Sequence, residues 1–160
     1  MWAMAKPESE VSMNFHRAKT DPERALDAIL SRDKDDVNVF EYLTRHTPGI
    51  KTTDYANMFT AAYKQAVTDM EAQQVQENCG GKYIQGELCG IDFSPVTCAQ
   101  DVTDTFYLYR TEQISKREAI IAYAWPKSLH ASATYRLLKK NGRWKLDGVM
   151  CAGGAKFNME

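Results

Sequence analysis

The sequence contains no long hydrophobic run, no excess of either charge and only three histidines. No stretch approaches the roughly 20 apolar residues that a membrane-spanning helix requires, so we expect no membrane span. The net charge of −1 argues against a nucleic-acid-binding protein, because such proteins usually carry a strong basic excess. His16, His46 and His130 are scattered along the chain and do not suggest a zinc hydrolase.

The motifs of several common enzyme classes are also missing. There is no Gly-x-Ser-x-Gly nucleophile elbow, no phosphate-binding loop and no dinucleotide fingerprint. Gly80-Gly81 comes nearest to a phosphate loop, but Lys82 is followed by Tyr83 and not by Ser or Thr. No histidine stands beside a cysteine to act as its base. We therefore expect no cofactor, no catalytic residue and no enzyme activity.

The first six residues also lack the apolar core of a secretory signal peptide, as the mature form of an exported protein would. They could derive from an expression vector, and we leave them out of the fold prediction. Residues 7–20 are expected to form a loose arm or an edge strand, so that residues 1–20 together make up an N-terminal arm. Residues 152–160, which include Gly153-Gly154, are expected to be a frayed tail.

Four cysteines are present, and three of them cluster within 20 residues: Cys79, Cys89 and Cys98, with Cys151 further along. An even number in an exported protein indicates two disulfides, with three possible connectivities. Four buried thiols in a cytosolic protein are the alternative. A zinc site is a third interpretation, but there is no Cys-x-x-Cys pair and no nearby histidine.

The strongest local pattern is a β-hairpin over residues 131–151. Asn141-Gly142 suits a two-residue turn, which needs positive φ at both central positions. The register then places Leu137 opposite Leu146 and Arg136 opposite Asp147. One face is predicted to be apolar and to cover a core: Ala133, Tyr135, Leu137, Trp144, Leu146 and Met150.

Helices are predicted before the strands. Thr20-Asp21-Pro22 starts a helix that ends near Ser31 or Arg32, and the charge run Arg32–Asp36 is expected to be a solvated connection. A short helix follows near residues 37–43, and a long amphipathic helix is predicted from Thr52 to about Gln76. Residues 79–101 read as a long loop. The order predicts one α+β domain over residues 21–151, with three helices packed on an antiparallel sheet of about four strands.

The stretch Asp92-Phe93-Ser94-Pro95-Val96-Thr97-Cys98-Ala99-Gln100-Asp101 resembles a loop found in a family of bacterial exported proteins of unknown function. Members of that family have the cone-shaped fold of the nuclear transport factor superfamily, also called cystatin-like. Gly142-Arg143-Trp144-Lys145-Leu146-Asp147 is similar to the family's closing hairpin. Ser94 and Val96 depart from its pattern, which has a second acid and an aromatic residue there. The resemblance implies a curved, cone-like sheet and export from the cytoplasm.

Candidate binding residues are large amphipathic rings predicted on the sheet and carboxylates of the long loop: Tyr107, Tyr109, Tyr123, Trp125, Asp92 and Asp101. In this interpretation the chain is a periplasmic or secreted, non-enzymatic binding protein. It docks a protein partner or a small apolar ligand, and one version is an immunity or inhibitor protein for a toxic enzyme. A homodimer remains open.

The alternative is a small cone-fold isomerase or hydrolase that uses a pocket Asp and Tyr. For the cysteines we favour Cys79–Cys89, which closes a short local loop, and Cys98–Cys151, which joins the long loop to the final strand.

Overall fold

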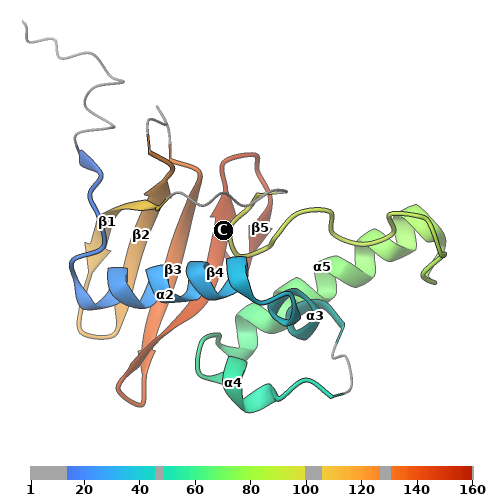
Figure 1. Cartoon of the computed structure of the whole chain (residues 1–160), viewed down its shortest axis with the longest axis horizontal. Coiled ribbons are helices and arrows are strands. Elements are labelled where there is room, and N and C mark those ends of the chain that lie inside the picture. Colours follow the sequence, from blue (N-terminus) through green and yellow to red (C-terminus); the bar gives the residue numbers. More distant parts are fainter. Residues whose placement is uncertain (1–13, 46–48, 100–105, 127–130, 160) are drawn as a thin grey trace, which may run out of the picture.

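The computed structural model describes residues 14–45, 49–99, 106–126 and 131–159. Helices precede strands: α2 (Asp21–Asp35), α3 (Asn38–Arg45), α4 (Thr52–Ala56) and α5 (Ala61–Cys79), then β1 (Leu108–Ile114), β2 (Glu118–Ala124), β3 (Ala133–Lys140), β4 (Arg143–Cys151) and β5 (Lys156–Phe157). The strands form an antiparallel sheet in the order β1-β2-β3-β4-β5. Helix α2 crosses one face of this sheet, and α5 runs away from its edge (Figure 1). The predicted α+β class is confirmed.

Helix α2 begins at a capping box. The side chain of Thr20 accepts a hydrogen bond from the backbone N–H of Glu23, and the Glu23 carboxylate accepts one from the backbone N–H of Thr20. Leu26, Ile29 and Leu30 are buried on its inner side. The helix continues through the charge run to Asp35, so the predicted end near Ser31 or Arg32 and the predicted solvated connection are wrong.

The predicted long helix is broken at residues 57–60. Phe59 forms a bridge to Leu146 of β4, and the backbone N–H of Thr60 donates to the carbonyl oxygen of Leu146 at 3.0 Å. The Thr60 hydroxyl then caps α5 by accepting from the backbone N–H of Tyr63. Pairing with a strand far along the chain therefore ends α4, and apolar spacing alone could not reveal it.

The hairpin between β3 and β4 keeps the predicted register at its tip, where Leu137 faces Leu146. A bulge at Asp147 then shifts the pairing by one residue, so Arg136 faces Gly148 and not Asp147. Val149, not Met150, consequently enters the core. The predicted ion pair survives the shift, because Arg136 Nε lies 2.7 Å from Asp147 Oδ2.

The two ends of the described chain are attached to the sheet. His16 pairs with Tyr109 through two backbone hydrogen bonds of 2.9 and 2.7 Å, as an edge strand would. Residues 156–157 form β5, in which Phe157 is fully buried and packs on Phe93. The prediction of a frayed tail is therefore wrong for residues 156–157. No helix in the described ranges has the length and apolar character needed to cross a membrane.

All four cysteines are paired, with disulfides Cys79–Cys89 and Cys98–Cys151. The favoured connectivity is confirmed. The first disulfide joins Cys79, the last residue of α5, to Cys89 in the loop that follows. The second joins Cys98, in the segment before β1, to Cys151, the last residue of β4.

Candidate functional site

The Cys79–Cys89 loop, residues 79–89, follows the last turn of α5. Gly80 takes a left-handed conformation with φ of 68°, which ends the helix, and its N–H donates to the carbonyl oxygen of Gln76 at 3.1 Å. The disulfide then holds Cys89 against Cys79 at the end of the helix, 10 residues earlier in the sequence. Because α5 runs away from the sheet, the loop lies at the far end of the molecule (Figure 1).

Apolar side chains on this loop face solvent. Tyr83, Ile84 and Leu88 are 53%, 50% and 67% exposed. They are three of the six large hydrophobic side chains that are exposed among the described residues, so exposed apolar surface is concentrated here. Concentrated apolar surface with a polar surround is typical of an interaction site.

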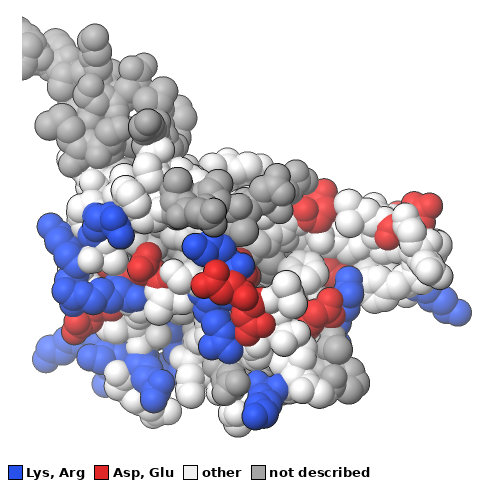
Figure 2. Space-filling view, viewed as in Figure 1, with Lys and Arg blue, Asp and Glu red and all other residues white. Residues whose placement is uncertain are grey.

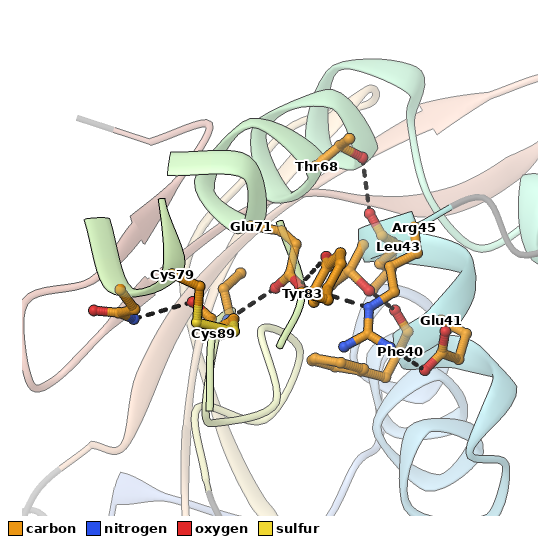
Figure 3. Close-up of polar contacts among 12 residues, drawn as sticks. Phe40, Glu41, Leu43, Arg45, Thr68, Glu71, Cys79, Tyr83 and Cys89 are labelled. Carbon is orange, nitrogen blue, oxygen red and sulfur yellow. Dashed lines mark hydrogen bonds and ion pairs between the residues drawn. A yellow bond between two sulfur atoms is a disulfide. The ribbon is translucent and has the colours of Figure 1, made fainter. Parts of the chain in front are cut away.

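The buried carboxylate of Glu71 fixes the loop to helix α5. Glu71 on α5 is only 2% exposed, and it accepts hydrogen bonds from the hydroxyl of Tyr83 at 2.6 Å and from the backbone N–H of Ile91 at 2.8 Å (Figure 3). Gly90 packs so closely on this carboxylate that a Cβ atom there would overlap it. One side chain therefore fixes both Tyr83 within the loop and the backbone just after the loop.

Arg45 joins the loop to helix α3. Its guanidinium lies 4.6 Å from the centre of the Tyr83 ring, and its Nε is 3.6 Å from Oε2 of Glu71. The same side chain pairs with Glu41 at 3.1 Å (Figure 3). Cation, carboxylate and phenol thus form one network in which the Tyr83 ring keeps a defined orientation.

Further hydrogen bonds order the loop itself. The Asn78 side chain donates to the carbonyl oxygen of Cys89 at 3.0 Å, and the backbone N–H of Glu87 donates to the carbonyl oxygen of Ile84 at 3.0 Å. Such a loop loses little conformational entropy when it binds, so more of the contact energy appears as affinity. The arrangement is suited to binding and brings together no catalytic set of side chains.

A second feature, the inner loop of residues 94–98, lies against the buried face of the sheet. Three tyrosine hydroxyls donate to three consecutive carbonyl oxygens of this loop: Tyr63 to Pro95 at 3.0 Å, Tyr135 to Val96 at 2.6 Å and Tyr123 to Thr97 at 2.5 Å. Cys98 is joined to β4 by its disulfide. The inner loop therefore occupies the space between α5 and the sheet.

Asp33 faces the inner loop from α2. The Ser94 hydroxyl donates to Asp33 Oδ2 at 2.7 Å and accepts from the backbone N–H groups of Val96 and Thr97. Burial raises the pKa of the Asp33 carboxyl to about 6, although the Ser94 bond lowers it. The hydroxyls of Tyr107 and Thr97 are buried, and neither has a hydrogen-bond partner within the described part of the chain.

The aromatic residues predicted to bind lie mainly in the core. Tyr107 is 3% exposed, Tyr109 and Tyr123 are fully buried, and Trp125 is half-buried with its ring edge-on to Tyr107. The hydroxyl of Tyr109 donates to Asp27 at 2.6 Å, and burial raises its pKa. These rings therefore do not form the exposed surface that the sequence suggested.

The structure describes only one of the two carboxylates that were predicted to bind. Asp92 is exposed, whereas Asp101 lies outside the described residues. Sequence reasoning missed the exposed apolar residues of the Cys79–Cys89 loop, the buried carboxylate of Glu71 and the half-buried carboxylate of Asp33. The apolar residues could have been found, because apolar side chains in a short cysteine-closed loop have no core to enter. Nothing local marks Glu71 or Asp33, since their burial depends on elements distant in sequence.

Within the described ranges there is no group of three or more His, Cys, Asp or Glu side chains that could hold a metal ion. Comparisons with protein-family models, with curated proteins and with solved structures give no match. The resemblance to the exported family therefore stays a prediction.

Proposed function

We propose that this chain is an exported, non-enzymatic binding protein of the bacterial envelope that docks a protein partner through the Cys79–Cys89 loop. The observation that carries the proposal is the combination of exposed Tyr83, Ile84 and Leu88 with a backbone fixed by a disulfide and by buried Glu71.

Burial of the exposed apolar side chains against the partner supplies the affinity. A Leu or Ile side chain that moves from water into a partner's surface contributes roughly 1.5 to 3 kcal/mol. Tyr83 adds a ring whose orientation is already set by Glu71 and Arg45. Tyrosine is enriched among the few residues that dominate the affinity of protein interfaces.

Export is supported by the two disulfides, because such bonds form and persist in oxidising compartments. A periplasmic or secreted location follows as part of the proposal. An immunity or inhibitor protein that blocks a toxic enzyme is its most specific version, since a rigid protruding loop could enter the concave site of such an enzyme.

The test is affinity capture from envelope extract under non-reducing conditions, followed by measurement of the dissociation constant with the purified partner. The double variant Ile84→Ser/Leu88→Ser removes two apolar contacts and leaves Tyr83 and its network intact. Val37→Ser/Phe106→Ser is the matched control, because both residues are exposed apolar side chains away from the loop.

We expect one stoichiometric partner, retained by the wild type and by the control. The loop variant should bind it at least about a hundredfold more weakly, at about tenfold per buried aliphatic side chain. A partner that binds the loop variant and the wild type equally would overturn the assignment of the site.

A second candidate function is a small isomerase or hydrolase. It is favoured by one observation: the Asp33 carboxyl has a pKa raised to about 6, and its charge acts on the buried hydroxyl of Tyr107, which has no hydrogen-bond partner among the described residues. Thermal-shift screening of small apolar ligands against the wild type and Tyr107→Phe tests it. Ligands that stabilise only the wild type would support this candidate, and equal shifts in both proteins would exclude Tyr107 from the site.

A further inference from the structure

Two hairpin turns lie side by side at one end of the sheet. The β1–β2 turn covers residues 115–117, and the β3–β4 turn covers Asn141-Gly142. The backbone N–H of Lys139 donates to the carbonyl oxygen of Arg117 at 2.8 Å, which joins the two hairpins directly. Both turns are at the lower end of the sheet in Figure 1.

Six basic side chains gather on these turns and on the strand ends beside them; together they are called the basic sheet end: Lys116, Arg117, Lys139, Lys140, Arg143 and Lys145. Five are exposed and Lys145 is half-buried. The lower left of Figure 2 shows several Lys and Arg side chains among uncharged ones, with fewer Asp or Glu side chains beside them. Since the whole chain has a net charge of −1, the remainder of the molecule is acidic.

No ion pair among the described residues neutralises this positive charge. The ion pairs of the described residues involve other basic side chains, and none includes a member of the basic sheet end. Lys140 stands directly opposite Arg143 across the hairpin. Like charges in that position destabilise a sheet, so folding does not account for this arrangement.

Apolar groups accompany the cations. Ile114, the last residue of β1, is 59% exposed. Trp144 is half-buried, and the ammonium group of Lys139 lies 5.8 Å from the centre of its ring. Cations together with an exposed aliphatic side chain and an amphipathic ring are the composition of a surface that meets lipid headgroups.

We infer that the basic sheet end docks on the surface of an anionic phospholipid bilayer. Its cations contact headgroup phosphates, and Ile114 contacts the boundary of the acyl chains. Single-stranded nucleic acid fits less well, because binding to it uses open aromatic faces for base stacking and Lys139 lies over the Trp144 ring. The Cys79–Cys89 loop belongs to a different part of the molecule, so this inference does not depend on the proposed partner.

The experiment is flotation of the full chain with vesicles of phosphatidylcholine alone or mixed with phosphatidylglycerol. The test variant is Lys139→Gln/Lys140→Gln/Arg143→Gln. The matched control, Lys34→Gln/Lys51→Gln/Lys156→Gln, removes the same charge from α2, the residue before α4 and β5. Thermal melts of the three proteins show whether each is folded.

The wild type should float only with the anionic vesicles, and added salt should release it, since exposed charges are screened over about 10 Å at 0.1 M salt. Each removed cation should weaken binding about fivefold, so the test variant should bind about a hundredfold more weakly while the control stays near the wild type. Equal losses in both variants, or no flotation of the folded wild type, would overturn the inference. Tighter binding to a single-stranded oligonucleotide than to the vesicles at the same salt would assign the surface to nucleic acid instead.

Discussion

The carboxylate of Glu71 on α5 accepts a 2.6 Å hydrogen bond from the hydroxyl of Tyr83, which lies in the Cys79–Cys89 loop. The other oxygen of the same carboxylate accepts the backbone N–H of Ile91, beyond the loop's second cysteine. One buried side chain therefore fixes both sides of the surface proposed to bind a partner. Both the order of the loop and its affinity for the partner should therefore depend on Glu71.

Replacement of Glu71 by Ala should lower the free energy of unfolding by about 2 to 4 kcal/mol, because a hydrogen bond to a charged group contributes about 1.5 to 3 kcal/mol. Urea denaturation measures this change. Glu77→Ala is the control, since Glu77 is exposed on the same helix and should change stability by no more than about 0.5 kcal/mol. Similar losses in the two variants would show that Glu71 has no special role.

Gly90 should tolerate no side chain while Glu71 keeps its position. The methyl group of Gly90→Ala would overlap the Glu71 carboxylate, which cannot move away without losing its two hydrogen bonds. We expect a loss of about 1 to 3 kcal/mol in the free energy of unfolding.

Gly153→Ala is the matched control for that substitution, because open space surrounds Gly153 and its backbone conformation suits an ordinary residue. In the double variant Gly90→Ala/Glu71→Ala the loss caused by Gly90→Ala should largely disappear. Full additivity of the two losses would contradict the proposed overlap.

The sequence predicted the fold class, the tip of the hairpin and both disulfides, since each has a local or compositional signal. Asn141-Gly142 specifies its turn directly. The bulge at Asp147 was not predictable in the same way. Asp147 accepts a 2.6 Å hydrogen bond from Thr60, which is 87 residues away in sequence, and that contact favours the extra residue in β4.

The candidate site likewise depends on contacts between residues distant in sequence, which the sequence did not reveal. Tyr107, Tyr109 and Tyr123 were predicted to bind because tyrosine is frequent at interfaces, yet the inner loop and α2 cover them. The Tyr123 hydroxyl donates to Thr97 because residues 94–98 fold back across the sheet, and the Tyr109 hydroxyl donates to Asp27 on α2. A chain segment without periodicity gives no sign that it enters a core, so burial of these rings could not be read from their own strands.

Loss of either disulfide should destabilise the protein, and the longer enclosed loop should matter more. In the chain-entropy account the 53-residue separation of Cys98–Cys151 corresponds to about 4 kcal/mol, and the 10-residue separation of Cys79–Cys89 to about 3 kcal/mol. Urea denaturation of Cys98→Ala/Cys151→Ala and Cys79→Ala/Cys89→Ala compares them.

The two disulfides should also differ in function. Only the Cys79→Ala/Cys89→Ala variant loosens the loop that carries Tyr83, Ile84 and Leu88, so it should lose more partner affinity than the Cys98→Ala/Cys151→Ala variant, although it should lose less stability. If the Cys98→Ala/Cys151→Ala variant, measured while still folded, lost affinity equally, the Cys79–Cys89 loop would not be the docking surface.

Asp33 should make stability fall as pH rises. Its pKa is about 6 in the folded protein against 3.8 for the free side chain, so folding favours the protonated, neutral form. The cost of ionising it is absent below about pH 4, grows through pH 6 and then reaches roughly 2 to 3 kcal/mol. Asp33→Asn keeps a side chain that can pair with Ser94 and removes this titration.

The measurement is the difference in the free energy of unfolding between Asp33→Asn and the wild type at about pH 5 and about pH 8. The free energy of unfolding of Asp33→Asn should rise relative to that of the wild type as pH rises. Taking the difference cancels groups such as Glu23 and Asp36, whose lowered pKa values act in the opposite direction. Asp35→Asn, an exposed change on the same helix, should show no such trend. A pH-independent difference for Asp33→Asn would mean that the carboxyl is ionised and solvated in the folded protein. Such a result would also remove the one observation that favours an enzymatic role for Asp33 and Tyr107.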